Sequence, residues 1–343
     1  MLSKYHVSRD GKVRPCRSKG VCPLGTSFDN KNYAENYVVM KAEETGKLEA
    51  ALKENREYTI DEALQRGKFV DKTVSMQLAS KKDTESLYFD RDKGAYTKER
   101  QVIHREILDS LHEKYKDIPS DKKSIFSAGL PGAGKTTVLN MLRDGDAGVN
   151  TDEYAVVSSD DIKEIFAERD MIPKVDGLSR MEASTLVHRE SSYLADKFLM
   201  ELSNKNKNVI YDFTCKDPVS TMRRMDILKD NGYEEKDMQF VFVDIPLNVA
   251  EKRANFRYAS GLNSGLKEED HIGGRYLPKE VLYKNKSKTG KYSSVNAESL
   301  LEVYNENKDN GMPEPIIYDN SGDIFSDPSY KPERLVFKEF SSR

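Results

Sequence analysis

Runs of apolar residues alternate with amphipathic stretches through the chain after about residue 120. The runs that predict strands lie at residues 124–128, 154–159, 208–213, 239–245 and 314–320. Apolar positions at helical spacing occupy residues 135–143, 160–168, 181–202, 220–230 and 248–259. This alternation predicts an α/β fold, with a mainly parallel sheet covered by helices on both faces. Ligands of such folds bind at the carboxyl ends of the strands.

The N-terminal part of the chain has a different pattern. Residues 1–26 are rich in Lys, Arg, Gly, Pro and Cys without a helical period, which favours loops or a small hairpin. Residues 32–67 favour short helices, with Thr59 as an N-cap. A polar stretch follows, so we expect a small N-terminal loop and helix module over residues 1–85 and an α/β domain over residues 86–343.

A glycine-rich segment fits the phosphate-binding pattern G-x-x-x-x-G-K-[ST] between the first predicted strand and the next helix. Glycines let backbone N–H groups surround a phosphate, a lysine reaches the β/γ oxygens, and the hydroxyl ligates Mg²⁺. The sequence therefore predicts a P-loop NTPase-type fold that binds ATP and Mg²⁺. The predicted nucleotide-binding residues are Gly129, Pro131, Gly132, Ala133, Gly134, Lys135, Thr136 and Thr137.

Composition narrows the class of protein. The 343 residues are 37% hydrophobic and 33% charged, with a net charge of -3 and a pI of about 6.1. This balance argues against a broad basic surface, so nucleic acid is not the expected partner. The sequence has no apolar run of about 18 residues and no apolar signal-peptide core near its start, so we expect no membrane partner and a cytoplasmic location. Its three cysteines do not suggest a disulfide framework.

Carboxylates follow the predicted strands after the phosphate loop. Asp160 and Asp161 follow the second strand, Asp212 ends the third with Thr214 just beyond, and Asp244 ends the fourth. Carboxylates at this edge can deprotonate an acceptor hydroxyl or hold the water shell of a metal ion. Helix capping is the alternative explanation, because Asp is a common N-cap residue.

Three arginines are candidates for binding transferred phosphate. Arg253 and Arg257 are four residues apart on one predicted helix, and Arg275 follows a Gly-Gly pair. Guanidinium groups can share the negative charge of a phosphoryl group in transfer. Surface salt bridging is the alternative.

Two further groups have a less specific pattern. His188 and Glu190 lie on the long helix expected on the acceptor side, where a single His more often has a structural role. His6, Cys16 and Cys22 offer three soft metal ligands. A fourth ligand and a tight Cys pair are missing, so the sequence leaves metal binding open.

From about residue 96 to 320 the chain resembles the zeta-toxin domain, a family of P-loop kinases from toxin–antitoxin systems. The similar motifs are GLPGAGKTT, SSDDIKEI, LVHRESS, VIYDFT, GGRYLP and IIYDN. The resemblance implies that Lys135 and Thr136 bind ATP-Mg and that Asp160 acts as the base toward the acceptor. It also implies phosphate contacts from Arg275 and Arg257.

The same resemblance implies a substrate. Characterised members phosphorylate the 3′-hydroxyl of the amino sugar in UDP-N-acetylglucosamine. The substrate-binding residues expected here are Asp161, Glu190, Asp212 and Thr214, and Asp212 is also expected to hold Mg²⁺ through water. Relatives often have Gly where this chain has Phe213, which narrows or reshapes the acceptor pocket.

The resemblance also implies regulation by an antitoxin protein, whose helix blocks the nucleotide site. Residues 32–67 are a candidate for such a restraint in cis. Two other functions stay open on sequence alone: a polynucleotide 5′-hydroxyl kinase, and a nucleotide-binding interaction protein that phosphorylates no acceptor.

Overall fold

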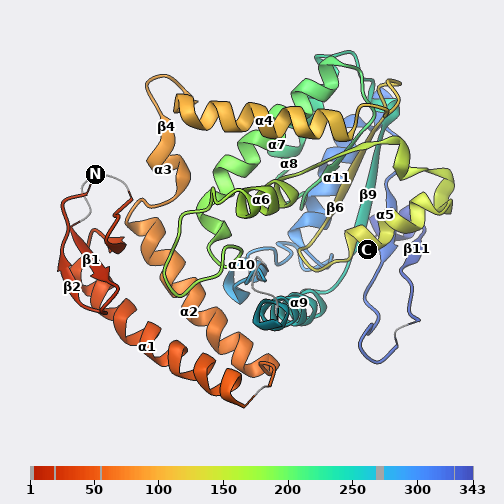
Figure 1. The fold of residues 1–343 in the computed structure, drawn as a ribbon. Helices are drawn as coiled ribbons and strands as arrows, with labels where there is room; N and C mark the ends of the chain where they lie inside the picture. The colour runs from red at the N-terminus through yellow and green to blue at the C-terminus, as the bar shows by residue number, and fades with distance from the viewer. Residues whose placement is uncertain (1–3, 19–20, 55, 268–273, 328, 343) are drawn as a thin grey trace. The chain divides into compact units, whose positions relative to one another are not determined.

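The protein is described by a computed structural model over residues 4–18, 21–54, 56–267, 274–327 and 329–342. The chain forms two compact units, and each unit combines three separate stretches of sequence (Figure 1). The first unit comprises Met1–Ile107, Asp160–Tyr193 and Asn255–Pro278. The second comprises Leu108–Ser159, Leu194–Ala254 and Lys279–Arg343. The boundary expected near residue 85 stays a prediction.

The second unit contains a six-stranded sheet in the order β11-β10-β9-β6-β8-β7. All neighbouring strands are parallel except β11, which pairs antiparallel with β10 at one edge. The strands are β6 (Ser124–Gly129), β7 (Ala155–Ser158), β8 (Val209–Asp212), β9 (Met238–Asp244), β10 (Ile316–Asp319) and β11 (Glu333–Leu335). The predicted α/β fold with a mainly parallel sheet is confirmed.

Strand register aligns the carboxyl ends of this sheet. Asp212 of β8 lies opposite Ser127 of β6 and Ser158 of β7. Asp244 of β9 lies opposite Asp319 of β10. The parallel register therefore places these carboxylates on the edge where α/β folds bind their ligands.

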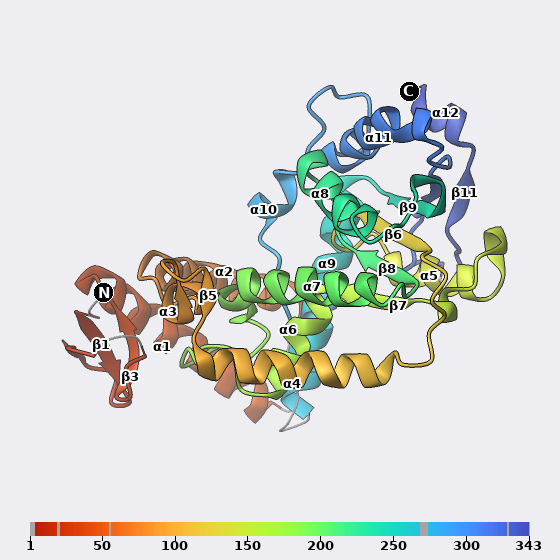
Figure 2. The same ribbon diagram turned by 90° about the horizontal axis from the view of Figure 1, so that it is seen from above.

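Helices flank the sheet of the second unit, and α8 and α11 lie side by side (Figure 2). The helices wholly within this unit are α5 (Lys135–Arg143), α8 (Pro218–Lys229), α10 (Lys279–Tyr283), α11 (Val295–Asn307) and α12 (Phe337–Ser341). Stacked rings of Phe126 and Phe240 lie in its core with centroids 4.8 Å apart, and Phe242 packs against Phe340. Burial of these large side chains stabilises the sheet–helix layers.

Four helices contribute residues to both units. They are α4 (Lys98–Lys114), α6 (Ser159–Glu168), α7 (His188–Asn204) and α9 (Leu247–Lys267). The predicted long helix over residues 181–202 begins later than expected, because a 3₁₀ turn over Ser184–Val187 precedes α7.

The first unit begins with a small antiparallel sheet in the order β2-β1-β3. Its strands are β1 (Tyr5–Ser8), β2 (Val13–Pro15) and β3 (Gly25–Phe28). The sheet is followed by α1 (Lys31–Lys53), α2 (Ile60–Ala79), α3 (Thr84–Tyr88), and the short strand pair β4 (Phe89–Asp90) and β5 (Ala95–Tyr96). Of the two alternatives expected for residues 1–26, loops or a small hairpin, the structure has a hairpin of β1 and β2, and β3 adds a third strand.

The short helices expected over residues 32–67 are instead two long ones, α1 and α2. The glycines within them, Gly46 and Gly67, weaken the local helical signal, and tertiary packing overrides it. Thr59 is the predicted N-cap of α2, and its hydroxyl accepts from the Glu62 amide while the Glu62 carboxylate accepts from the Thr59 amide. This capping box begins α2.

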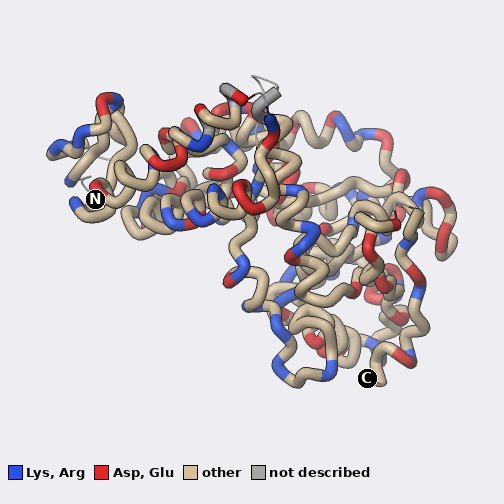
Figure 3. The backbone as a smooth tube through the Cα atoms, turned by 90° about the horizontal axis from the view of Figure 1, so that it is seen from below, with Lys and Arg blue, Asp and Glu red and all other residues tan. Residues whose placement is uncertain are grey.

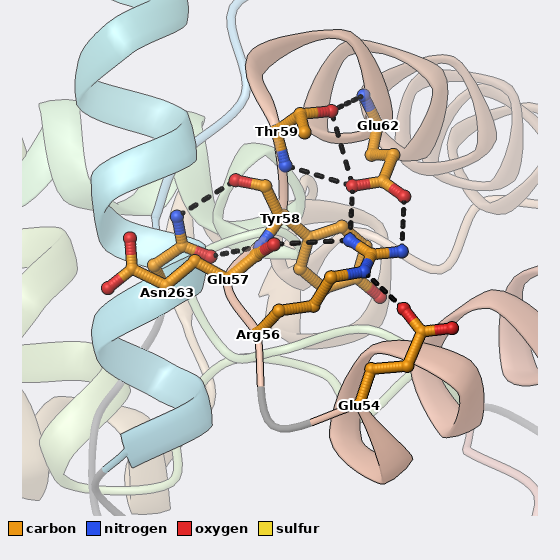
Figure 4. A network of polar contacts seen from close by, with 7 residues as sticks. All are labelled: Glu54, Arg56, Glu57, Tyr58, Thr59, Glu62 and Asn263. Atoms are coloured by element: carbon orange, nitrogen blue, oxygen red, sulfur yellow. Dashed lines mark hydrogen bonds and ion pairs between the residues drawn. The ribbon is translucent and has the colours of Figure 1, made fainter.

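Polar contacts hold the link between α1 and α2 (Figure 4). Arg56 donates both terminal nitrogens to Glu62, each bond measuring 2.8 Å. The Asn263 side chain on α9 bonds the backbone of Tyr58, accepting from its N–H at 2.8 Å and donating to its carbonyl at 3.1 Å. The start of α2 is therefore fixed to α9 within the first unit.

A buried ion pair joins α2 to the rest of the first unit. Arg66 donates to both carboxylate oxygens of Glu182 at 2.7 Å, and the Tyr258 hydroxyl donates to the same carboxylate at 2.7 Å. The Glu182 side chain is fully buried, so its negative charge would be strongly destabilising without the positive charge of Arg66. Ala63 of α2 packs beside Tyr258 in the same region.

Positive and negative residues are interspersed along the backbone of each unit (Figure 3). Among the described residues, no helix combines the length and the apolar character needed to cross a membrane.

Candidate active site

The phosphate-binding loop joins the end of β6 to the start of α5 in the second unit. Gly129 and Gly134 adopt φ angles of 148° and 87°, which lie in the region that favours glycine. A Cβ at Gly129 would lie 2.7 Å from the Val243 carbonyl oxygen. The helix α5 begins at Lys135, so its first amides and positive dipole end face the loop, as anion binding requires.

Two side chains, one after β9 and one after β10, bond the backbone of this loop. Asn320 directly follows β10, and its side-chain Nδ2 donates to the Ala133 carbonyl at 2.6 Å. Arg253 on α9 donates to the carbonyl of Gly322 at 2.9 Å and lies 3.5 Å from the Ala133 oxygen. Arg253 is buried, so it does not form the surface salt bridge given as the alternative, and its predicted contact with phosphate stays a prediction.

The side chains expected on the nucleotide lie at the same edge of the sheet. The Lys135 ammonium is 3.8 Å from a carboxylate oxygen of Asp212, and both side chains are partly exposed. Thr136 and Thr137 are exposed in the first turn of α5. A hydroxyl and a carboxylate are both oxygen donors of the kind that Mg²⁺ prefers, so the chemistry of Thr136 and Asp212 fits the metal.

The segment after β8 is fixed by packing. The ring of Phe213 contacts those of Phe126 and Tyr211, with centroids 6.0 and 5.5 Å apart. The Thr214 carbonyl accepts from Asn296 at 2.6 Å. The expected substrate contact of the Thr214 hydroxyl stays a prediction.

Asp160 lies in the first unit, in the first turn of α6, and is held by two cations. Arg275 donates both terminal nitrogens to the two oxygens of the Asp160 carboxylate, and the Nη2–Oδ2 bond measures 2.7 Å. The Lys163 ammonium, one turn along α6, donates to the same carboxylate at 2.8 Å. The predicted base and the predicted phosphate-binding arginine are thus partners in one ion-pair cluster.

These cations decide the charge of Asp160. Partial burial raises the pKa of the carboxyl, but the bonds and charges of Arg275 and Lys163 outweigh it and hold that pKa far below its ordinary value. Asp160 is therefore ionised and, while paired with Arg275, a weak base. Arg257 lies on α9 with an exposed side chain. Desolvation and the positive charge of Arg275 lower the pKa of its guanidinium, and the charge of Asp160 partly opposes them.

The other predicted residues of the acceptor side differ in environment. Asp161 is exposed on α6, next to Asp160. Glu190 is fully buried, with one oxygen 2.7 Å from His104 Nε2 and the other accepting from Arg100 at 3.1 Å. A substrate would have to displace these bonds to reach Glu190, whose substrate-binding role stays a prediction. His188 is exposed at the start of α7.

The segment that carries Arg275 is packed against α2. The Tyr276 ring lies over Gly67 so closely that a Cβ on Gly67 would be 2.2 Å from its Cε2 atom. Tyr276 also packs against Tyr258, with ring centroids 5.2 Å apart. The sequence analysis gives Gly67 no role. A glycine in the middle of a helix is unfavourable, so its presence in α2 was the one sign that another group packs closely there. Gly273, which precedes this segment in the predicted motif, lies outside the described residues.

The family is decided by a sequence comparison. The zeta toxin family model matches residues 107–306, which is more than half of the chain. The chain belongs to the zeta toxin family. It is accordingly a phosphotransferase built on a P-loop fold. No curated protein matches the chain.

The comparison with solved structures gives similar chains of low sequence identity. A chain from the crystal structure of AvrRxo1-ORF1:AvrRxo1-ORF2 with sulphate ions has a TM-score of 0.51 and 16% identity, covering 74% of this chain and 76% of that one. A structure of AvrRxo1-ORF1:-ORF2 with ATP gives a TM-score of 0.48 at 16% identity, covering 71% and 68%. A chain from the PezAT chromosomal toxin–antitoxin system of Streptococcus pneumoniae gives 0.41 at 15% identity, covering 66% and 78%.

Proposed function

We propose that this zeta toxin is an ATP-dependent kinase that phosphorylates a hydroxyl of a nucleotide sugar similar to UDP-N-acetylglucosamine. The observation that carries the proposal is the phosphate loop that precedes α5, with Lys135 and Asp212 together at the carboxyl edge of the sheet. Membership of the family supports the phosphotransfer reaction.

The reaction assigns one role to each group. Lys135 and the amides that begin α5 would bind the β- and γ-phosphates, while Thr136 and, through water, Asp212 would hold Mg²⁺. When bound, the metal neutralises charge on the phosphates. The acceptor oxygen forms a bond to the γ-phosphorus, its proton goes to Asp160, and the bond from that phosphorus to the bridging oxygen breaks to release ADP.

Arg275 controls the basicity of Asp160 in this scheme. A carboxylate held by a bidentate arginine and a lysine accepts a proton poorly, because its pKa lies far below neutral pH. An anionic group of the substrate that draws Arg275 away raises this pKa. Asp160 then becomes a competent base only when substrate is bound, and the displaced guanidinium stabilises phosphoryl charge.

The acceptor class rests on the family resemblance. Phe213 stands where relatives often have Gly, and its ring is packed into the aromatic cluster with Phe126 and Tyr211. We expect a reshaped acceptor pocket, so UDP-sugars other than UDP-N-acetylglucosamine belong in the test.

The experiment incubates the full chain with γ-labelled ATP and Mg²⁺ in separate reactions containing UDP-sugars, a 5′-hydroxyl oligonucleotide or a metabolite extract. Mass spectrometry then identifies any product heavier by one phosphate. We expect a phosphorylated UDP-sugar, no transfer by Lys135→Ala, and a loss of about 10²-fold or more in Asp160→Asn with unchanged ATP binding. Asp226→Asn, which changes an exposed carboxylate on α8, is the matched control.

Each contrary result points to another function. Label on the oligonucleotide alone would identify a polynucleotide 5′-hydroxyl kinase. Tight ATP binding with no product from any acceptor would identify a nucleotide-binding interaction protein. Near-normal turnover by Asp160→Asn would remove Asp160 as the base.

Regulation is a separate part of the proposal. A kinase toxin that acts on an essential metabolite needs restraint, so we infer an antitoxin protein or restraint in cis by the N-terminal module. The contacts of α2 with Glu182 and Tyr276 give that module a structural role as well. Deletion of residues 1–85 would remove both roles together, so ATP turnover in point variants at the exposed surface of α1 is the better test of restraint.

A further inference from the structure

The small sheet at the start of the first unit gathers the three soft ligands noted in the sequence. The candidate ligand atoms of His6, Cys16 and Cys22 all lie within 4.8 Å of one another, and all three residues are buried. None of them belongs to the predicted kinase machinery. Their convergence therefore calls for a separate explanation.

Strand pairing explains how these residues meet. His6 lies on β1, the central strand, and Cys16 directly follows β2. The Cys16 amide donates to the Lys4 carbonyl at 2.8 Å, which holds this residue next to the start of β1. Cys22 comes from the segment that leads to β3, and its sulfur is 3.4 Å from that of Cys16.

The imidazole of His6 supplies an independent observation. His6 is only 5% exposed, yet its Nδ1 atom has no hydrogen-bond partner among the described residues. An unsatisfied buried ring nitrogen is costly, and coordination of a cation would satisfy it. The nitrogen belongs to the same cluster as the two sulfurs.

We propose that His6, Cys16 and Cys22 bind one zinc ion that stabilises the N-terminal sheet. Two thiolates on one tetrahedral zinc are separated by about 3.8 Å, given Zn–S bonds of about 2.3 Å, whereas a disulfide requires about 2.05 Å. The observed sulfur separation is nearer to the first value. Sulfur and imidazole donors together favour zinc over the oxygen-preferring Mg²⁺ of the kinase reaction.

A structural role follows from the size of the sheet. Its strands have only three or four residues each, and small elements of this kind often need a metal or a disulfide to supplement a limited core. The ion would connect His6 on β1 to Cys16 just after β2 and to Cys22, which precedes β3. A fourth coordination position remains for water or another donor.

The direct test is the metal content of the full chain, purified under reducing conditions from zinc-supplemented cells. We expect about one zinc per chain by elemental analysis, and loss of that zinc in Cys16→Ser and Cys22→Ser. Cys215→Ser is the matched control, because Cys215 is a buried thiol outside the cluster, and this variant is expected to retain the zinc.

Cobalt substitution and an added ligand keep the test independent of misfolding. Co²⁺ added to the metal-free full chain is expected to give the absorbance bands of tetrahedral cobalt–thiolate coordination. Ser27 lies opposite His6 in the strand register, so Ser27→His is expected to supply a fourth ligand and tighten metal binding.

Three results would overturn the proposal. They are a metal-free native chain that gives no cobalt–thiolate bands, equal zinc content in the cluster variants and the control, and a Cys16–Cys22 disulfide in the chain isolated without reductant. The kinase reaction is not involved in any of these measurements.

Discussion

Arg275 and Asp160 form a bidentate ion pair in which guanidinium Nη1 donates to carboxylate Oδ1 and Nη2 donates to Oδ2. The proposed base is thus neutralised by a group that is itself a proposed phosphate ligand. Catalysis in this scheme requires the pair to separate, and its strength sets the pH range in which Asp160 can act.

Replacement of Arg275 by Met is expected to move the acid limb of the kcat/KM profile to higher pH. The cation lowers the Asp160 pKa, so its removal raises that pKa, and kcat/KM reports ionisations of the free enzyme. The rate at neutral pH is expected to fall as well, because a phosphate ligand is lost. Initial rates measured across pH give both effects. Arg180→Met, at an exposed arginine of the same unit, should leave the limb in place, and an unmoved limb in Arg275→Met would show that another group titrates.

Gly67→Ala is expected to lower phosphotransfer about tenfold or more, although Gly67 is far along the sequence from the predicted site residues. The added Cβ would overlap the Tyr276 ring and displace the residue next to Arg275. Rates with saturating ATP measure the effect. The second substitution Tyr276→Ala should restore part of the lost rate. Gly46→Ala, also in a helix but with open space around it, should be neutral or stabilise by about 0.5–1 kcal/mol. Equal rates in all three variants would contradict a positioning role for this contact.

Asn320→Ala is expected to raise the KM for ATP about tenfold with a smaller change in kcat. The substitution removes the bond that holds the Ala133 carbonyl and loosens the phosphate loop, at a cost of about 1.4 kcal/mol in binding. Steady-state kinetics separate the two constants. Asn310→Ala, at an exposed asparagine, is the control. An unchanged KM would mean that Arg253 alone fixes the loop.

Arg66→Met is expected to destabilise the protein by about 3–5 kcal/mol, because it leaves the Glu182 carboxylate buried without its cation. Chemical denaturation monitored by circular dichroism measures the loss. The double variant Arg66→Met/Glu182→Gln removes the uncompensated charge and should recover much of the stability. If the double variant is no more stable than the single one, charge burial is not the cause.

Much of the second unit could be predicted from sequence, because its elements have strong local signals. The apolar strands, the glycines of the phosphate loop and the Asp212 that ends β8 are all patterns within a few neighbouring residues. Such local patterns are typical of a parallel sheet and its ligand-binding edge. The loop's support was harder to predict. Arg253 and Asn320 are 67 positions apart and meet only through the fold, so their shared contact with Ala133 has no local pattern.

The first unit was less predictable for the same physical reason. Thr59 could be identified as a cap because its capping box is local, within three residues of Glu62. The Arg66–Glu182 pair joins residues 116 positions apart, and its burial follows from tertiary packing. The pairing of Asp160 with Arg275 likewise depends on long-range contact, although each residue was identified separately.

The discontinuous make-up of the first unit determines when it can form during synthesis. Arg66 leaves the ribosome well before Glu182 and Tyr258, the residues with which it packs, so the first stretch of this unit must wait for its second and third stretches. Long-range contacts of this kind slow folding and expose unfinished apolar surface to chaperones and proteases. A chain whose translation stops between Thr137 and Tyr258 would therefore carry the whole phosphate-loop sequence but no finished first unit, and we expect it to be degraded.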